Sequence, residues 1–307
     1  MDRVATWPPL RLGEVNRALR VSVVPGGKGF NVARAAVRLG AQATSYGFLG
    51  GQVGEALRSM ITTDGVLDRH TTIAAGTRIC FIVVELELGR TTVLNEPGPA
   101  VSVEEAERLL EDLRGDVTRD DLLVLSGSLP DSVDPVMAAK IVDIGHAAGA
   151  RTLVDIHGPA LRSAVARAPW MVKCNRHELL ELLDADDPGA PVSLPDLAAH
   201  VRRLQTRGIE IVVVTMGAEG ALLADGEGIV HAMVPAIEEV NPTGSGDLLL
   251  AGLVVGIERG QRPREALVLG AACGTAGATH LKPELPPGFE PVAWTSRITT
   301  RELTRQA

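Results

Sequence analysis

A turn of small residues that runs directly into an apolar segment constrains this chain more than any other feature. Residues 241–247 read Asn-Pro-Thr-Gly-Ser-Gly-Asp, and residues 248–257 contain no charged side chain. The apolar segment predicts a buried helix, and the glycines of the turn let the backbone approach a ligand closely. The free N–H groups and the dipole at the start of such a helix favour a bound anion.

A carboxylate in the first turn of this helix indicates chemistry as well as binding. Asp247 directly follows Gly244, Ser245 and Gly246. Backbone amides there would hold the charge that develops on a transferred phosphoryl group, and the carboxylate would take a proton from the attacking hydroxyl. The alternative is an ordinary helix start, with Ser245 as the cap and Asp247 complementing the dipole. The turn alone leaves both interpretations open.

Composition narrows the class of protein. A chain of 307 residues with 45% hydrophobic content is long enough for one large α/β domain. The net charge of −8 and the scattered basic residues argue against a nucleic-acid partner. No apolar run reaches ~18 residues and no signal peptide is recognised, so we expect no membrane span. Three cysteines without a CxxC motif are typical of reduced thiols, which predicts a cytoplasmic protein.

A regular alternation of strands and helices begins near residue 100. The candidate strands are 121–125, 151–156, 170–173 and 209–215, and helical patterns separate them. This order predicts a mostly parallel sheet with helices on both faces, and ligands in such folds bind beyond the carboxyl ends of the strands. Before residue 100, a strand near 18–24 and a hairpin over 79–94 predict a small separate sheet. We expect no strand at residues 1–7.

Six motifs in a fixed order resemble one family. Residues 26–33 and 241–247 are similar to the N-terminal and C-terminal signatures of the ribokinase, or phosphofructokinase B, sugar kinases. The segments 95–99, 126–130, 173–178 and 216–220 match further landmarks between them, and 95–99 is typical of the branch with 1-phosphofructokinase and tagatose-6-phosphate kinase. The resemblance implies a single ribokinase-like domain over residues 1–307. Its fold would be a three-layer α/β/α sandwich with a mostly parallel central sheet and a small β-sheet lid near 8–24 and 72–98.

The resemblance also implies roles for matched positions, with ATP and Mg²⁺ as cofactors. Asp247 matches the general base, and the three preceding residues match the anion hole. Residues implied to bind the nucleotide are Lys173, Asn175, Thr215, Gly217, Gly220 and Thr243. Glu178 matches a residue that organises Mg²⁺, largely through water, which suits an ion that keeps several waters. Residues implied to bind the sugar are Asp2, Gly27, Asn31 and Ser128.

A cation inside the first glycine turn points to the class of substrate. Kinases of free sugars in this family usually lack a residue such as Lys28, so Lys28 and Arg78 are implied to bind a phosphate already present on the sugar. Arginine suits bidentate phosphate recognition. The resemblance therefore implies a phosphorylated ketohexose, first fructose 1-phosphate, then tagatose 6-phosphate or fructose 6-phosphate. A binding protein with impaired catalysis is the rival from another class. We expect structural roles for Asp155 and Arg90.

The N-terminal region departs from the family pattern. A strand that ends in Asn-Pro-x-x-Asp is missing, and Asp2 falls where its final aspartate would be. Our hypothesis is that the chain was started at an internal methionine, so that a core strand of about five to six residues is absent. Its absence would leave a gap or an exposed edge in the sheet. The resemblance also implies a homodimer that pairs through the lid.

Overall fold

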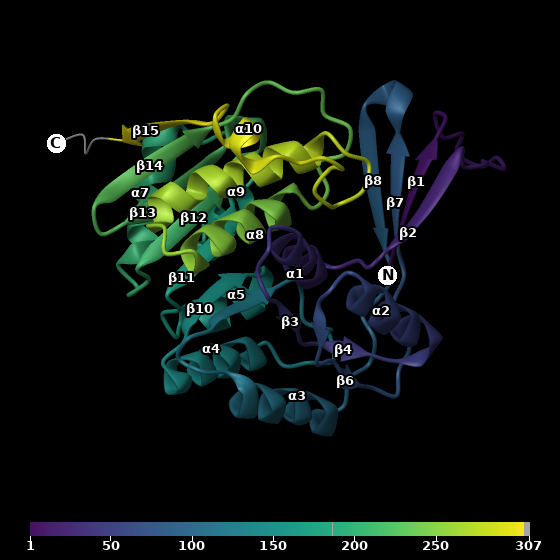
Figure 1. Cartoon of the computed structure of the whole chain (residues 1–307), viewed down its shortest axis with the longest axis horizontal. Helices are drawn as coiled ribbons and strands as arrows, with labels where there is room; N and C mark the ends of the chain where they lie inside the picture. The colour runs from purple at the N-terminus through teal and green to yellow at the C-terminus, as the bar shows by residue number, and fades with distance from the viewer. Residues whose placement is uncertain (186, 304–307) are drawn as a thin grey trace.

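The main sheet has seven strands in the order β15-β14-β13-β12-β11-β10-β9 (Figure 1). The computed structural model describes residues 1–185 and 187–303. Strands β9 to β12 are parallel, and β13 to β15 continue the sheet in antiparallel pairs. The strands are β9 (Leu122–Ser126), β10 (Arg151–Asp155), β11 (Met171–Asn175), β12 (Ile211–Thr215), β13 (Ala221–Asp225), β14 (Gly228–Met233) and β15 (Thr299–Leu303).

Helices cover both faces of this sheet because successive side chains of its strands point to opposite sides. Leu153 and Val213 face α1, α8 and α9, whereas Val154 and Val212 face α4 to α7. The helices are α1 (Lys28–Arg38), α2 (Gly51–Thr63), α3 (Val103–Asp116), α4 (Val136–Ala148), α5 (Gly158–Val165), α6 (Arg176–Leu182), α7 (Leu194–Gln205), α8 (Ser245–Glu258), α9 (Pro263–Ala278) and α10 (Pro291–Thr295). The three-layer fold and the buried helix at 245–257 are therefore confirmed. None of the helices in the described part of the chain is long and apolar enough to cross a membrane.

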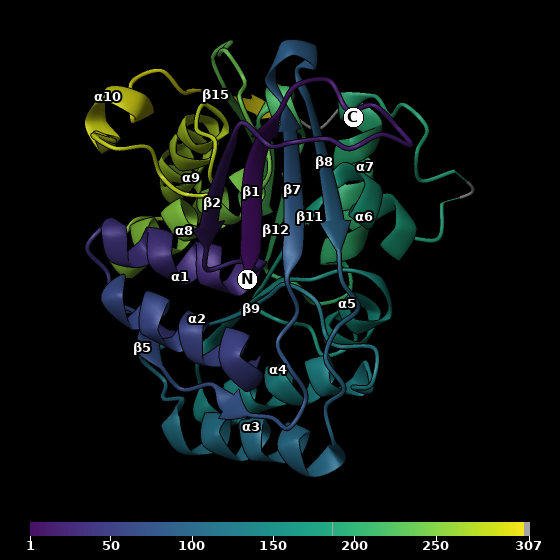
Figure 2. The ribbon, with the colours of Figure 1, turned by 90° about the vertical axis from the view of Figure 1, so that its right-hand side faces the viewer.

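The lid is a second sheet in the order β2-β1-β7-β8, and Figure 2 shows its strands side by side. Its strands are β1 (Asp2–Trp7), β2 (Arg20–Val24), β7 (Cys80–Glu85) and β8 (Arg90–Asn95). The expectation of no strand at residues 1–7 is wrong: β1 pairs antiparallel with β2 and parallel with β7. The predicted hairpin is confirmed as β7 and β8.

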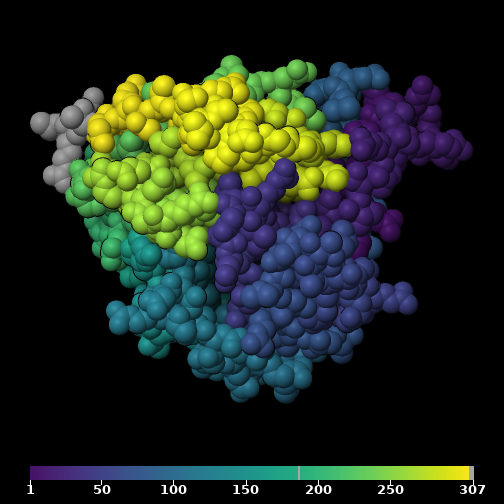
Figure 3. Space-filling model, in the orientation of Figure 1, coloured from purple at the N-terminus to yellow at the C-terminus, as the bar shows by residue number. Residues whose placement is uncertain are grey.

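One face of the lid packs onto the rest of the molecule. Val4 and Ile82 are buried there, and Leu281 from the C-terminal region contacts this cluster. Figure 3 shows the same proximity, because the yellow C-terminal segment borders the purple N-terminal one. The opposite face keeps Val21 and Phe81 exposed.

The sheet ends at β9 with a gap beside it. Four two-residue strands lie outside the main sheet: β3 (Thr44–Ser45), β4 (Phe48–Leu49), β5 (Leu67–Asp68) and β6 (Thr71–Thr72). Strand β3 pairs with β5, and β4 pairs with β6. Within the described residues, β9 pairs with β10 alone. In the described part of the chain, β9 is therefore one of the two edges of the main sheet.

The close packing of α8 against α9 depends on glycine. A Cβ added at Gly252 would lie 2.8 Å from the backbone oxygen of Leu269 and 2.9 Å from Sγ of Cys273. We expect Gly252→Ala to lower the free energy of unfolding by about 1–3 kcal/mol, because the helices must move apart. Chemical denaturation measures this.

The matched control is Gly115→Ala in α3, where no atom lies within 4 Å of the added Cβ. That change should leave stability unaltered or raise it by up to about 1 kcal/mol through helix propensity. Equal stability of the two variants would contradict the importance of the α8–α9 contact.

Candidate active site

Asp247 is buried in the first turn of α8, where its carboxylate faces the N-terminal helix. Asn31 of α1 donates a hydrogen bond from Nδ2 to Oδ2 of Asp247 at 2.8 Å. Gly244 precedes the helix with φ of 84°, a left-handed conformation that favours glycine. A Cβ there would also lie 2.5 Å from Cβ of Pro283. Two elements that are distant in sequence thus meet at this carboxylate.

The start of α8 is not an ordinary capped helix end. Gly244 occupies the N-cap position, and no side chain caps the helix. Ser245 does not act as the cap, because its buried hydroxyl has no hydrogen-bond partner. Uncapped N–H groups at a helix start are suited to binding an anion. The expected alternative of a Ser245 cap is therefore wrong, whereas Asp247 does lie in the first turn, where its charge complements the helix dipole.

Two lysines and an aspartate lie next to this turn. Lys173, in the middle of β11, donates a hydrogen bond from Nζ to Oδ2 of Asp155 at 2.7 Å. Lys28, at the start of α1, reaches Oδ1 of the same carboxylate at 3.4 Å. A Cβ added at Gly246 would lie 3.2 Å from Nζ of Lys173. The ammonium group of Lys173 therefore borders the uncapped turn.

Asp155 is a site residue that the sequence did not identify. Its side chain is fully buried at the end of β10 and holds both lysines. These ion pairs agree with the expected structural role, and the charge of Asp155 also acts on the neighbouring carboxylate of Asp247. The available signal was its position directly after a parallel strand, the same position that singled out other residues.

Burial and the negative charge of Asp155 raise the pKa of Asp247 to about 6, although Lys173 and Asn31 oppose the shift. Burial alone would lower the pKa of Lys173, but Asp155 and Asp247 outweigh burial and raise it. Lys173 therefore stays charged. At neutral pH Asp247 is mostly ionised, with a basicity suited to proton transfer.

Asn175 and Glu178 form the capping box of α6. The Asn175 side chain accepts from the N–H of Glu178, and Oε2 of Glu178 accepts from the N–H of Asn175, both at 2.8 Å. The second oxygen of Glu178 lies 3.8 Å from Nζ of Lys28. Glu178 thus keeps one oxygen for other ligands. Across residues 1–185 and 187–303, no group of three His, Cys, Asp or Glu side chains could hold a metal ion by itself.

The residues implied to bind the nucleotide lie at the same edge of the sheet. Thr215 ends β12 and is the register partner of Asn175. Gly217 and Gly220 follow it with φ of 59° and 87°. A Cβ at Gly220 would lie 2.0 Å from the carbonyl oxygen of Ala232, so only glycine fits. Thr243 donates its N–H to Asn241 at 3.0 Å in the turn before α8.

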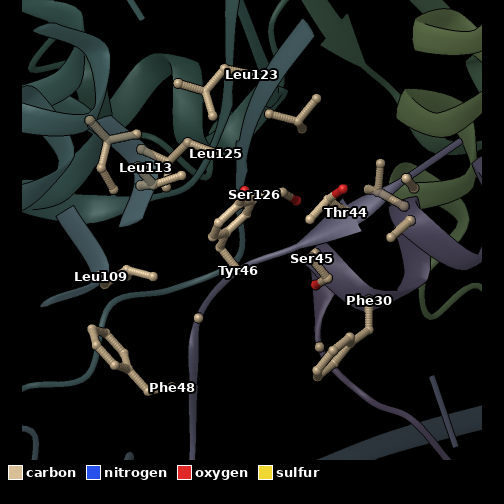
Figure 4. A pocket seen from close by; sticks show the side chains of 18 of the residues that line it. Phe30, Thr44, Ser45, Tyr46, Phe48, Leu109, Leu113, Leu123, Leu125 and Ser126 are labelled. Atoms are coloured by element: carbon tan, nitrogen blue, oxygen red, sulfur yellow. The ribbon is translucent and has the colours of Figure 1, made fainter. Parts of the chain in front are cut away.

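Four of the residues implied to bind the sugar or its phosphate line one cavity of about 630 Å³ (Figure 4), namely Asp2, Gly27, Arg78 and Ser128, whereas Lys28 and Asn31 do not line it. Arg78 donates to Oγ of Ser128 at 3.4 Å. A Cβ on Gly26 would lie 1.9 Å from the Asp2 carboxylate, so this glycine lets Asp2 approach.

The contacts of Lys28 differ from those expected, whereas the contacts of Arg90 agree with expectation. Lys28 was expected to act with Arg78, but its ammonium contacts Asp155 and Glu178 instead. The acidic groups attract it deeper into the site. Arg90 has the expected structural role, because it pairs with Glu85 within the lid at 2.6 Å.

Comparison with known proteins identifies relatives over almost the whole chain. Residues 1–285 match the family model described as pfkB family carbohydrate kinase. The chain is 33% identical to 1-phosphofructokinase of Bacillus subtilis over 278 residues, which cover 91% of this chain and 89% of that protein. It is 31% identical to tagatose-6-phosphate kinase of Staphylococcus epidermidis over 269 residues, covering 87% and 85%.

Solved structures have the same fold. Phosphofructokinase-2 of Escherichia coli in complex with fructose-6-phosphate superimposes with a TM-score of 0.83 at 27% identity, covering 90% of each chain. The potassium complex of that enzyme gives a TM-score of 0.88 at 26% identity, covering 96% of this chain and 94% of the other.

Because the charge of Asp155 raises the pKa of Asp247, we predict that this pKa changes when Asp155 is substituted. Asp155→Asn removes the negative charge that helps to raise the pKa of Asp247, and it frees Lys173 to stabilise the ionised form. We therefore expect the pKa of Asp247 to fall from about 6 towards its ordinary value of 3.8. NMR titration of ¹³C-labelled aspartate carboxyls measures this shift.

Asp143→Asn is the matched control. Asp143 is exposed on α4 and pairs with Arg167 at 3.4 Å, away from the site. This variant should leave the titration of Asp247 unchanged. An unaltered pKa of Asp247 in Asp155→Asn would show that burial alone causes the shift.

Proposed function

The chain belongs to the pfkB family of carbohydrate kinases and is thus a phosphotransferase with a hydroxyl acceptor, and we propose that it transfers the γ-phosphate of ATP to a phosphorylated ketohexose. Fructose 1-phosphate is the first candidate, and tagatose 6-phosphate and fructose 6-phosphate are the alternatives. The observation that carries the proposal is Asp247: a buried carboxylate with a pKa of about 6, beside Lys173 and uncapped amides.

The reaction needs a proton acceptor and a site for developing charge. Asp247 takes the proton from the attacking sugar hydroxyl, while Asn31 fixes the orientation of its carboxylate. The N–H groups of Gly244 and Gly246 and the ammonium of Lys173 stabilise the charge on the phosphoryl oxygens, whereas the N–H of Ser245 donates to the carbonyl oxygen of Pro242 at 3.1 Å. Positioning and electrostatics therefore supply the catalysis.

The remaining polar groups lie on the side of the site where we propose that ATP, the phosphoryl donor, binds. Thr215, Gly217, Gly220 and Thr243 are proposed to line the nucleotide pocket. Mg²⁺ would neutralise phosphate charge when bound, and Glu178 would hold it through water with the one oxygen that the capping box leaves available. The absence of a three-residue acidic cluster among the described residues agrees with an ion held mainly by phosphates and water.

The sugar's own phosphate is proposed to bind Arg78 and Ser128. These two side chains contact each other on the wall of the cavity, and arginine is suited to phosphate oxygens. Lys28 lies deeper, near Asp155 and Glu178, so we assign it to the phosphoryl group in transfer as well as to the substrate. The relatives named above act on phosphorylated sugars, which supports this class of substrate.

The lid is proposed to pair two subunits. Its outer face exposes Val21, Val23, Phe81 and Leu94, four apolar side chains on three strands of the same sheet. A contiguous exposed apolar face commonly marks a protein interface.

A substrate panel tests the function. ADP release is measured with fructose 1-phosphate, tagatose 6-phosphate, fructose 6-phosphate and the unphosphorylated ketohexoses. We expect turnover with one or more phosphorylated sugars and much weaker turnover with free ones. Binding without turnover across the panel would favour the impaired binding protein, and a preference for free sugars would reject the phosphate site.

The role of Asp247 predicts both a variant effect and a pH dependence. Asp247→Asn should lower kcat by about 10²–10⁴-fold with little change in binding, because the amide cannot accept the proton. In the unaltered chain, kcat/KM should fall about tenfold per pH unit below pH 6, since protonation removes the base. Steady-state kinetics from pH 5 to pH 8 measure both. Near-normal turnover in the variant would reject Asp247 as the base.

The position of Arg78 predicts that its substitution weakens the binding of the phosphosugar and not that of ATP. Arg78→Ala should raise the KM for the phosphosugar by about 10- to 100-fold and leave that for ATP nearly unchanged, because a charged hydrogen-bond donor is lost. Arg90→Ala is the control, since Arg90 pairs within the lid. Equal changes in both KM values for Arg78→Ala would exclude a specific role in binding the sugar phosphate.

A further inference from the structure

The loop between β12 and β13 lies against a strand that contributes none of the residues assigned to the site. Residues 216–220 form this loop, which we call the nucleotide loop. Gly220 closely approaches the carbonyl oxygen of Ala232 on β14. The residue before Ala232 contacts the residue before Gly220, because Nε2 of His231 lies 2.7 Å from the carbonyl oxygen of Glu219. Two consecutive residues of β14 thus support two consecutive residues of the loop.

The contact of His231 with Glu219 has a defined direction. A carbonyl oxygen can only accept a hydrogen bond, so Nε2 of His231 carries the hydrogen and donates it to Glu219. The other ring nitrogen, Nδ1, is buried and has no hydrogen-bond partner among residues 1–185 and 187–303. A buried polar atom without a partner costs free energy. The imidazole therefore carries a cost in this position that an apolar side chain would not have.

The surroundings of His231 would suit an apolar side chain. His231 is 6% exposed, and its register partner on β13 is the fully buried Leu222. Side chains two residues apart on a strand point to the same face, so His231 shares a face with Ile229, which belongs to the apolar cluster between the sheet and α4 to α7. Leucine would pack in such a position with no unpaired nitrogen. What histidine adds is the hydrogen bond to the nucleotide loop.

A second contact with Glu219 comes from α6 and is expected to contribute less. Nη2 of Arg176 donates to Oε1 of Glu219 at 2.7 Å. The side chains of Arg176 and Glu219 are 29% and 60% exposed. Ion pairs as exposed as this one are screened by water and salt and stabilise proteins little. The hydrogen bond from His231 to the backbone is therefore the stronger restraint on the loop.

We propose that His231 is a positioning residue for nucleotide binding, an inference that rests on the proposed role of Gly217 and Gly220 in the nucleotide pocket. Glu219 lies between these glycines, so the bond that holds its carbonyl restrains both of them. Glycine loses more conformational freedom on ordering than other residues, so a loop with two glycines depends on contacts from outside. Without this bond, ATP would have to order the loop as it binds, which lowers its affinity.

The nucleotide loop is separate from the sugar side of the site. Neither residues 216–220 nor His231 line the cavity that contains Asp2, Arg78 and Ser128. A change at His231 should therefore weaken the binding of the nucleotide and leave that of the phosphosugar nearly unaltered. A general loss of folded structure would affect both substrates.

The test replaces His231 by leucine, which removes the donor and keeps an apolar side chain in the cluster. We expect His231→Leu to raise the Kd for ADP with Mg²⁺, measured by calorimetry without sugar, and the KM for ATP by about tenfold each. The KM for the phosphosugar should stay nearly unchanged. His231→Gln should recover most of the affinity, because its amide can donate from nearly the position of Nε2. An unchanged Kd for ADP in His231→Leu would overturn the proposal.

Ile229→Ala is the matched control for lost stability. Ile229 is buried on the same face of β14, but its register partners, Ala224 and Leu303, lie away from the nucleotide loop. This change should lower the free energy of unfolding, measured by chemical denaturation, and leave the Kd for ADP unchanged. A similar rise of that Kd in Ile229→Ala and His231→Leu would mean that instability alone weakens nucleotide binding, and it would overturn the proposal.

Amide hydrogen exchange separates this proposal from the proposed function. In the nucleotide-free chain, His231→Leu should speed exchange in residues 216–220, where the N–H of Gly220 donates to Gly217, and leave β10 unchanged. Unchanged exchange in the loop would overturn the proposal, because His231 would then not restrain it. Failure of the proposed function would appear instead as no turnover of the unaltered chain with any sugar of the panel. The exchange and ADP measurements do not require turnover.

Discussion

The site depends on a group of charges buried where the strands of the main sheet end. Asp155 ends β10, Lys173 lies on β11, Lys28 begins α1 and Asp247 begins α8. Buried charges are tolerated only when paired, and here two carboxylates balance two ammonium groups. Because four separate elements supply these groups, the balance exists only in the folded chain. It also sets the basicity of Asp247, which a surface carboxylate would not have.

The sequence predicted those parts of the site that depend on local signals. The glycine turn before α8 was recognisable because Gly244 needs a left-handed backbone and Asp247 follows at a fixed distance. Asn175 and Glu178 were named only through the family resemblance, and the capping box that they form within four residues was not predicted. The alternation of strands and helices gave the three-layer fold, since it reflects how side chains point to either face of a sheet.

Long-range contacts explain what the sequence did not predict. Residues 2–7 form a strand because β2 and β7 flank them, and β7 lies more than 70 residues away in the chain. The importance of Asp155 comes from Lys173 and Lys28, which no spacing rule connects to it. Strand β15, Thr299–Leu303, is mostly exposed and polar, so it lacks the alternation of apolar residues that predicts a strand.

The position of β9 at the edge of the main sheet affects the two halves of the site differently. Asp155 and Lys173 lie on strands paired on both sides, so their backbone is well supported. Ser128 instead follows β9, which pairs only with β10 among residues 1–185 and 187–303, and Asp2 begins β1 on the wall of the same cavity. Binding groups must be held within about 0.5 Å of their productive positions. The sugar side of the site therefore has less support from paired backbone than the phosphoryl-transfer side, which the buried ion pair of Asp155 and Lys173 also fixes.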